Sequence, residues 1–234
     1  MRPNLLYAVG ETENDTAGEE RTPQSLDEQT MRRCFALAAQ SSKEREYPFG
    51  AVVVRKGEIL AEATNRVARD CDVTRHAEIV AMAEAQRKLG DADLSDCTLY
   101  SNVEPCAMCS YAIREARLAR VVFALRSPVM GGFSRWNILN DCHLSTTMPQ
   151  VFEPPPEVVA GVLAEEADSV LRQVAPVVWA FIRANGLLLV EPQDAVRRVN
   201  GRVYRFGALM RWLTRAMRLT ISDRFGRGRG RHYD

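Results

Sequence analysis

The sequence predicts a three-layer α/β/α domain built on a mixed central sheet of about five strands. Short apolar runs alternate with longer stretches of helical periodicity, in the order α-β-β-α-β-α-β, and mostly helical sequence follows. The runs at 51–54 and 120–125 are apolar enough to lie on central, doubly covered strands. A hydrophobic content of 46% with 26% charged residues excludes a chain that is disordered throughout.

The first elements are a helix and a hairpin. Ser25 and Glu28 form a capping box, which predicts that an amphipathic helix begins at Ser25 and continues until the Pro48 region. Residues 51–54 and 58–64 flank a Lys-Gly pair, which is typical of two strands joined by a tight turn.

Helices and strands then alternate. Thr74 is a candidate cap for a helix over 75–89, and Gly90 stands where such a helix is expected to end. The next predicted elements are a strand at 98–103, a helix from Pro105 to about residue 117, a strand at 120–125, and a helix opened by the prolines at 154–156 that carries Val159, Leu163, Val170 and Leu171 on one face.

Charge divides the chain unevenly. The net charge is +1, but residues 195–234 hold eleven arginines against two aspartates, a balance of +9. We therefore expect a polar N-terminal arm over 1–24, one domain over 25–190, and a basic tail over 191–234 with one amphipathic helix and a disordered end. Such a tail can contact a polyanion such as RNA, can bind a membrane surface or a partner, or can be a solvated appendage.

The apolar runs are too short for a membrane span. The longest, at 175–182, has eight residues, whereas a span needs about 18–20. The N-terminus turns acidic before any apolar signal-peptide core, so we expect a cytoplasmic protein. In a reducing compartment the six cysteines are no evidence for disulfides.

The chemistry-bearing residues fall in two short segments. Cys106 and Cys109 stand three apart at the start of a predicted helix, so both sulfurs project to one side, and the helix N-terminus favours a thiolate. His76 from a second helix would complete a donor set that suits Zn²⁺ and leaves a fourth position for water, as in a catalytic site. Glu78 stands two residues beyond His76, where it could exchange protons with that water.

The other candidate ligands have a simpler explanation. Cys34 and Cys97 fall on apolar faces and are expected in the core, and Cys71 and Cys142 are expected in loops. His143 could supply a fourth ligand, which would make the site closed and structural but would leave Glu78 without a task.

Together these segments give the pattern H-x-E followed by P-C-x-x-C, the signature of zinc nucleobase deaminases. With YPFGAVVV at 47–54, DVTRHAE at 72–78 and TLYSNVEPCAMC at 98–109, the stretch 31–152 resembles the cytidine and deoxycytidylate deaminase superfamily. It is most similar to the branch of guanine, cytosine and tRNA adenosine deaminases. The resemblance implies a cytidine-deaminase-like fold and, as in many members, a homodimer.

The resemblance also implies residue roles. His76, Cys106 and Cys109 would bind Zn²⁺, and Glu78 would move protons while an amino group on a base is replaced by a carbonyl and ammonia is released. The side chain of Asn65 and main-chain groups of Ala77 and Glu104, which match family positions that contact the base, would bind the substrate.

The substrate is less sharply predicted. Asn102 and the residues around Ser110 depart from the tRNA adenosine deaminase pattern, and so does MGGFSRW at 130–136, where Phe133 and Trp136 could line the pocket or belong to the core. These departures favour a small nucleobase or nucleoside as substrate. The alternatives are a tRNA adenosine deaminase that contacts RNA through the basic tail, and a non-catalytic zinc-binding interaction module.

Overall fold

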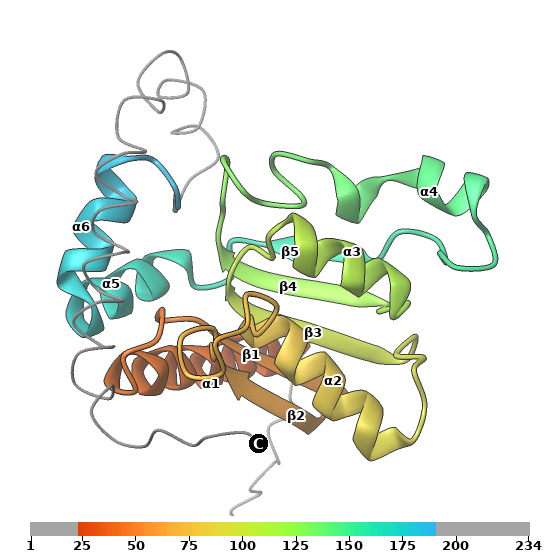
Figure 1. The fold of residues 1–234 in the computed structure, drawn as a ribbon, viewed down its shortest axis with the longest axis horizontal. Helices are drawn as coiled ribbons and strands as arrows, with labels where there is room; N and C mark the ends of the chain where they lie inside the picture. The colour runs from red at the N-terminus through yellow and green to blue at the C-terminus, as the bar shows by residue number, and fades with distance from the viewer. Residues whose placement is uncertain (1–22, 191–234) are drawn as a thin grey trace, which may run out of the picture.

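A computed structural model describes residues 23–190 of the chain (Figure 1). Residues 1–22 of the N-terminal arm expected over 1–24, and the whole basic tail expected over 191–234, lie outside the described residues. In chain order the elements are α1 (Pro23–Lys43), β1 (Gly50–Arg55), β2 (Glu58–Thr64), α2 (Ala77–Leu89), β3 (Cys97–Val103), α3 (Ala107–Glu115), β4 (Arg120–Leu125), the 3-10 turn η1 (Ile138–Asn140), α4 (Cys142–Thr147), β5 (Glu157–Ala160), α5 (Ala164–Val174) and α6 (Pro176–Ala184).

The sheet has five strands in the order β2-β1-β3-β4-β5. Strand β1 runs antiparallel to both β2 and β3, whereas β3, β4 and β5 are parallel to one another. A parallel pair needs a crossover connection, which α3 supplies between β3 and β4 and the segment 126–156 supplies between β4 and β5. The predicted mixed sheet is therefore confirmed.

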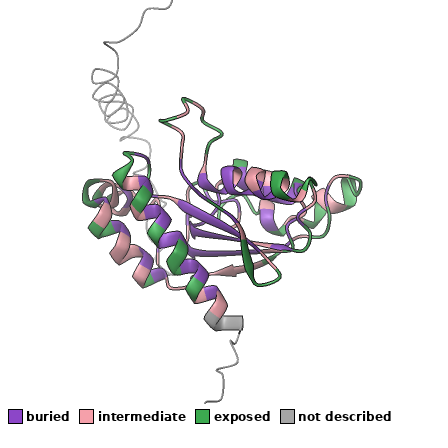
Figure 2. Cartoon of the chain, turned by 90° about the horizontal axis from the view of Figure 1, so that it is seen from below, coloured by how far each residue is buried: buried purple, intermediate pink, exposed green. Residues whose placement is uncertain are grey.

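Alternation along the strands builds two cores, one on each face of the sheet. Val53 and Leu99 face the layer of α2 and α3, whereas Val52 and Tyr100 face the layer of α1 and α5. Figure 2 shows the central strands largely buried, and exposed residues lie on the outer faces of the helices, in the loops and on the edge strands β2 and β5. Both cysteines expected in the core, Cys34 and Cys97, are buried.

The helix predicted to begin at the prolines 154–156 is wrong. Residues 157–160 form β5, which pairs with β4 from Arg120 to Phe123, and the helix begins only at Ala164. Proline lacks a backbone donor and biases the residue before it toward extended geometry, so three in a row favour a strand entrance. Val158 and Val159 then pack on opposite faces of the sheet, as residues of a strand do.

Two helix starts also differ from prediction. Helix α1 begins at Pro23 rather than at Ser25. Helix α2 has His76 rather than Thr74 at its N-cap, because the hydroxyl of Thr74 hydrogen-bonds the carboxylate of Asp72 instead. Its predicted end is confirmed: Gly90 adopts the left-handed conformation, with φ of 66°.

Helix α1 is joined to the sheet through a buried acidic side chain. The carboxylate of Asp27 accepts hydrogen bonds from both Nη1 and Nη2 of Arg120 at 2.8 Å and from the Tyr100 hydroxyl at 2.7 Å. Burial by itself would raise the pKa of Asp27, but the bonds from Arg120 and Tyr100 outweigh it and hold that pKa below its usual value.

One edge of the sheet carries the chemistry. Strands β3 and β4 end at this edge, and β1 begins there beside the end of β2, since Gly50 pairs with Thr64. The N-terminus of α3 follows β3 directly, so polar groups at these chain positions converge. Within residues 23–190, no helix combines the length and the apolar character needed to cross a bilayer.

Candidate metal centre and active site

Three metal-ligating side chains meet between α2 and α3. His76 is the N-cap of α2, Cys106 is the N-cap of α3, and Cys109 lies in the first turn of α3. The Nδ1 atom of His76 lies 3.5 Å from each of the two Sγ atoms, and the two Sγ atoms are 3.6 Å apart. The two cysteines, 30 and 33 positions after His76 along the chain, thus present their donors to the same point as the imidazole.

The spacing of the donors fits a tetrahedral ion. Zinc bound to sulfur at about 2.3 Å and to imidazole at about 2.0–2.1 Å requires S–S separations of about 3.8 Å and S–N separations of about 3.5–3.6 Å. The observed separations match these values within about 0.2 Å. Among residues 23–190 the structure groups three such donors here, which leaves one tetrahedral position for another molecule.

The charges of the donors suit a cation. Hydrogen bonds from Cys109 and His76 lower the pKa of Cys106 to about 4, so its sulfur is a thiolate at neutral pH. The same thiolate raises the pKa of His76 and raises the pKa of Cys109 well above its usual value. A thiolate, an imidazole and a second sulfur at the N-terminus of α3 are the soft-to-borderline ligands that zinc prefers.

Glu78 lies beside the donors in the first turn of α2. Its side chain is buried, at 4% exposure, and it is close enough to Cys109 for each group to shift the pKa of the other. Desolvation by burial raises the pKa of Glu78 to about 7. A carboxyl group with such a pKa can both accept and return a proton at neutral pH.

Asn65 reaches the same edge of the sheet from the end of β2. Its side chain is 1% exposed, and its backbone N–H donates to the carbonyl of Phe49 at 3.0 Å. The next residue, Arg66, donates its backbone N–H to the carbonyl of Arg75 at 2.9 Å. Asn65 precedes Arg66 and His76 follows Arg75, so this hydrogen bond brings Asn65 and His76 to the same edge of the sheet.

The other two residues expected to bind the base differ in what their side chains do. Ala77 is buried as the first residue of α2, where backbone N–H groups have no partner within the helix. The Glu104 carboxylate accepts hydrogen bonds from the backbone of Ser127, Phe133 and Ser134 at 2.6–3.0 Å and from the Ser134 hydroxyl. This side-chain role was not predicted: Glu104 holds the loop after β4 against the segment that leads into Cys106 and Cys109.

A pair of glycines allows this close approach. A Cβ atom on Gly131 would lie 1.9 Å from Oε1 of Glu104, and one on Gly132 would lie 2.0 Å from Oγ of Ser110. The backbone N–H of Gly132 donates to the carbonyl of Pro105 at 2.9 Å. The Gly-Gly pair in the sequence was the available signal for this contact.

Asn102 was expected to report on the substrate, but its side chain serves the scaffold. Its Oδ1 accepts from the backbone N–H of Gly50 at 2.9 Å, and its Nδ2 donates to the carbonyl of Pro48 at 3.0 Å. With 1% exposure it has no surface to offer to a ligand. Its departure from the pattern therefore says nothing against an RNA substrate.

The structure also places the other three candidates, His143, Phe133 and Trp136. His143 lies on α4, where its ring is 3.3 Å from the hydroxyl of Thr147, and it is not among the grouped donors. The ring of Phe133 packs edge-on against Phe123 in the core, with centroids 6.0 Å apart. Trp136 is 56% exposed beside Arg135, so it is not a core residue.

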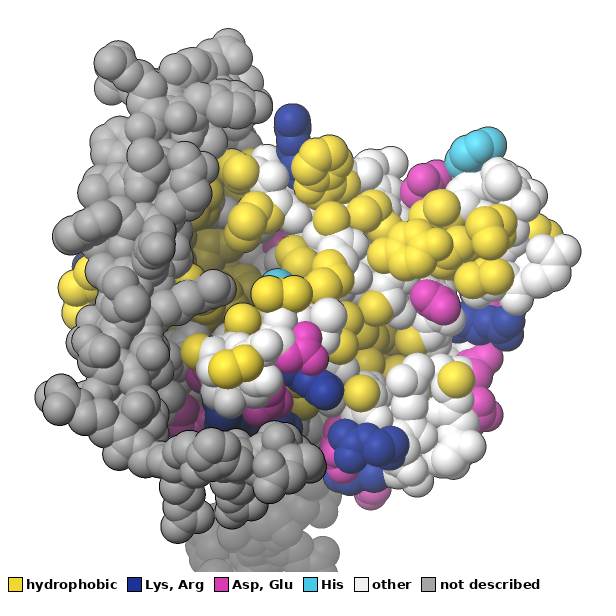
Figure 3. Space-filling model, viewed as in Figure 1, with side chains coloured by type: hydrophobic (Ala, Val, Ile, Leu, Met, Phe, Trp, Pro, Cys, Tyr) yellow, Lys and Arg dark blue, Asp and Glu magenta, His cyan; other side chains and the backbone are white. Residues whose placement is uncertain are grey.

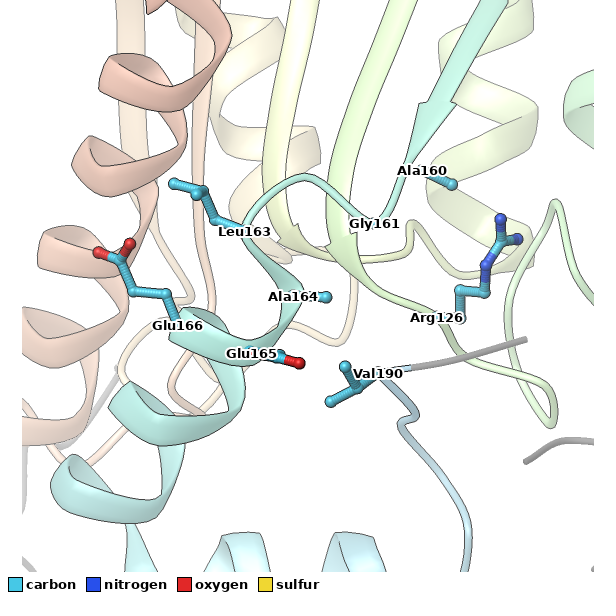
Figure 4. Close-up of a pocket in the computed structure, with 8 residues that line it drawn as sticks. All are labelled: Arg126, Ala160, Gly161, Leu163, Ala164, Glu165, Glu166 and Val190. Atoms are coloured by element: carbon cyan, nitrogen blue, oxygen red, sulfur yellow. The ribbon is translucent and has the colours of Figure 1, made fainter. Parts of the chain in front are cut away.

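The surface of the described chain has two further features. Exposed apolar side chains gather on the face seen in Figure 3. The exposed large hydrophobic residues of the described chain include Met108 and Tyr111 on α3 and Met130 and Trp136 after β4. A hollow of about 520 Å³ opens at the start of α5, between Arg126 and Glu165 (Figure 4). Its lining residues include none of the proposed ligands or substrate-binding residues.

Comparison with known proteins agrees with this geometry. The sequence model of the cytidine and deoxycytidylate deaminase zinc-binding region matches residues 24–125. The tRNA-specific adenosine deaminase of Aquifex aeolicus is 38% identical over 118 residues, which cover 50% of this chain and 78% of that protein. A tRNA(Ile)-lysidine synthase of Deinococcus radiodurans is 39% identical over 145 residues, but the chain spans only about a quarter (24%) of its length.

Solved structures show the same likeness. A structure from a study of A-to-I editing by tRNA A34 deaminases is 31% identical with a TM-score of 0.51, covering 56% of this chain and 95% of that one. Guanine deaminase from Nitrosomonas europaea is 26% identical with a TM-score of 0.51, covering 65% of this chain and 84% of that one. The chain belongs to the cytidine and deoxycytidylate deaminase family.

Proposed function

We propose that the chain is a zinc-dependent hydrolytic deaminase that acts on a purine ring. The observation that carries this proposal is the tetrahedral spacing of one imidazole and two sulfurs beside the buried carboxyl of Glu78. The two kinds of deaminase to which the chain is similar act on adenosine in tRNA and on guanine, and both substrates are aminopurines.

His76, Cys106 and Cys109 would hold Zn²⁺. When bound, zinc would lower the pKa of a water molecule from 15.7 toward about 7, which makes a nucleophile available at neutral pH. In the overall reaction water supplies an oxygen to the ring carbon, the C–N bond to the amino group breaks, and ammonia leaves.

Glu78 would carry the protons of this exchange. Its carboxylate takes a proton from the attacking water and delivers it to the ring nitrogen next to the reacting carbon. It then helps to protonate the departing amine. A pKa of about 7 for Glu78 supports both directions of transfer.

Asn65 and the backbone of Ala77 and Glu104 would bind the base. Their burial excludes competing water from the hydrogen bonds that they make to the ring. The chemical step needs the ring held in one orientation against Glu78, which fixed groups of this kind provide.

Adenosine in tRNA is the substrate that we place first. The chain covers 78% of the Aquifex aeolicus tRNA-specific adenosine deaminase and 85% of one from Streptococcus pyogenes, with 38% and 33% identity. The charge of +9 over residues 195–234 also favours a polyanion. Free guanine is the second candidate, since guanine deaminase has the same fold with 26% identity.

Ammonia release from the full zinc-loaded chain tests the proposal. We expect ammonia and inosine from a tRNA preparation, at a rate that falls steeply as the salt concentration rises. Turnover of free guanine with none of tRNA would transfer the assignment to the second candidate. No ammonia release from tRNA, free bases or nucleosides would contradict a deaminase and would favour a zinc-bearing interaction module.

We further propose that the protein acts in the cytoplasm as a homodimer. The exposed side chains of Met108 and Tyr111 on α3 supply an apolar face that a second copy could cover. Light scattering on the full chain measures the mass of the particle, and the mass of a single 26.2 kDa chain would contradict the dimer.

A further inference from the structure

We propose that Glu46 is a positioning residue that fixes the side-chain amide of Asn65 in the orientation needed to bind the base. The inference rests on the proposed function, because it assumes that Asn65 contacts substrate. Nothing in the sequence pattern points to Glu46, which lies 19 positions before Asn65 in the connection between α1 and β1.

Glu46 is a buried carboxylate with donors on both oxygens. Its exposure is 8%. Its Oε2 accepts from Nδ2 of Asn65 at 3.0 Å and from the backbone N–H of Ala68 at 3.1 Å, and its Oε1 accepts from the backbone N–H of Arg69 at 2.6 Å. Three donors therefore converge on one buried side chain, and a carboxylate, which has acceptor oxygens only, can bind all three.

This arrangement decides which way round the Asn65 amide lies. A carboxylate accepts but does not donate, so it binds the NH₂ end of the amide and repels the oxygen end. A flipped amide would place two oxygens about 3 Å apart in a buried site, at the cost of an unpaired acceptor. Oδ1 has no hydrogen-bond partner among residues 23–190, so it and the second N–H of Nδ2 are left for a ligand.

Glu46 is itself held firmly. Its backbone N–H donates to the carbonyl of Ser41 near the end of α1 at 3.0 Å. Through Ala68 and Arg69 it also fixes the loop that leads from Asn65 to His76. A carboxylate with both its backbone and its acceptors tied down can transmit a fixed orientation to the group that it binds.

A reciprocal exchange of acid and amide tests the inference through rescue. Asn65→Asp alone places two carboxylates within hydrogen-bond distance, and we expect kcat/KM to fall by about 100-fold or more. Glu46→Gln alone brings an NH₂ group to face the donors of its neighbours, and we expect kcat/KM to fall by about 10–100-fold. The double variant combines Glu46→Gln with Asn65→Asp. Its new amide can donate to its new carboxylate and restore the lost bond, so we expect it to be more active than Asn65→Asp alone.

Glu44→Gln is the matched control. Glu44 is exposed two residues earlier, and its carboxylate contacts the side chains of Gln40 and Arg69 rather than Asn65. We expect this variant to keep wild-type kcat/KM, to within about twofold. A loss as large as that of Glu46→Gln would show that the charge of the segment matters and not the bond to Asn65, and would overturn the proposal.

The side-chain amide signals of Asn65 in ¹H–¹⁵N spectra supply a readout that needs no substrate. The signals are assigned by their loss in Asn65→Asp. We expect them to be protected from solvent exchange in the wild type and in Glu44→Gln, and to shift and lose protection in Glu46→Gln. Unchanged Asn65 signals in Glu46→Gln would overturn the inference. So would a double variant whose loss in kcat/KM equals the product of the losses of the two single variants. An inactive wild type with protected signals would instead count against the proposed function alone.

Discussion

Arg66 and Arg75 are joined by a backbone hydrogen bond of 2.9 Å, which closes the loop between them. Their outer neighbours are Asn65, at the end of β2, and His76, at the start of α2. A single main-chain contact thus brings a proposed substrate-binding amide and a proposed metal ligand to the same edge of the sheet. The expected consequences can be measured one residue at a time.

Cys106→Ser should remove the metal. The hydroxyl that replaces the thiol is a poor zinc ligand at neutral pH, whereas the native sulfur, with its pKa of about 4, is a thiolate. We expect the purified variant to contain much less than one zinc per chain by elemental analysis. Cys71→Ser is the control, since Cys71 is exposed outside the donor group, and it should retain its zinc. Equal zinc in both variants would contradict the assigned ligands.

Gly131→Ala should disturb the loop after β4. The added methyl group would meet Oε1 of Glu104 at 1.9 Å and the carbonyl oxygen of Ser127 at 2.6 Å, so the carboxylate must move and lose donors. We expect the free energy of unfolding in urea to fall by about 1–3 kcal/mol, together with lower activity. Met130→Ala, at an exposed neighbouring position, should change the unfolding free energy little. An equal fall in the unfolding free energy of both variants would contradict the contact between the loop after β4 and Glu104.

Asp27→Asn should weaken the fold in a pH-dependent way. The folded-state pKa of Asp27 lies below its unfolded value, so its contribution to stability is fully present above about pH 4–5 and is lost as the pH falls through the folded pKa. We expect the variant to be less stable than wild type by about 1–3 kcal/mol at pH 7. This deficit should shrink toward about pH 3 in urea unfolding.

The exposed control for that experiment is Glu115→Gln on α3. It should follow the wild-type curve at every pH, because a surface carboxylate gains little from folding. A deficit in Asp27→Asn that stayed constant from about pH 7 to about pH 3 would mean that the charge of Asp27 beside Arg120 is not the source of the effect.

Local signals in the sequence were enough for most of the fold. The strands at 51–54 and 120–125 were predicted from their apolar character, and the end of α2 at Gly90 was predicted from the preference of glycine for helix ends. The failure at β5 is instructive. Its four residues are too few to show a strand period, and their placement depends on pairing with β4, which is a contact made at long range.

In the candidate site, too, the residues of short motifs could be predicted, whereas residues that act through long-range contacts could not. The donors His76, Cys106 and Cys109 stand in short motifs, so the grouping that the structure shows could be predicted. Glu46 and the side-chain role of Glu104 could not, because their partners lie 19 to 30 positions away with no fixed spacing. Asn102 was misread because an unusual residue beside a site can serve the scaffold beneath it.

The most direct test of the central claim is one paired measurement on Glu78→Gln: zinc content and ammonia release from the same sample. If Glu78 moves protons beside an intact metal site, the variant should hold as much zinc as wild type and should lose at least about 100-fold in kcat. Glu84→Gln, on the same helix and paired with Arg87 at the surface, should retain both. A zinc-loaded Glu78→Gln protein that still releases ammonia at the wild-type rate would contradict the account.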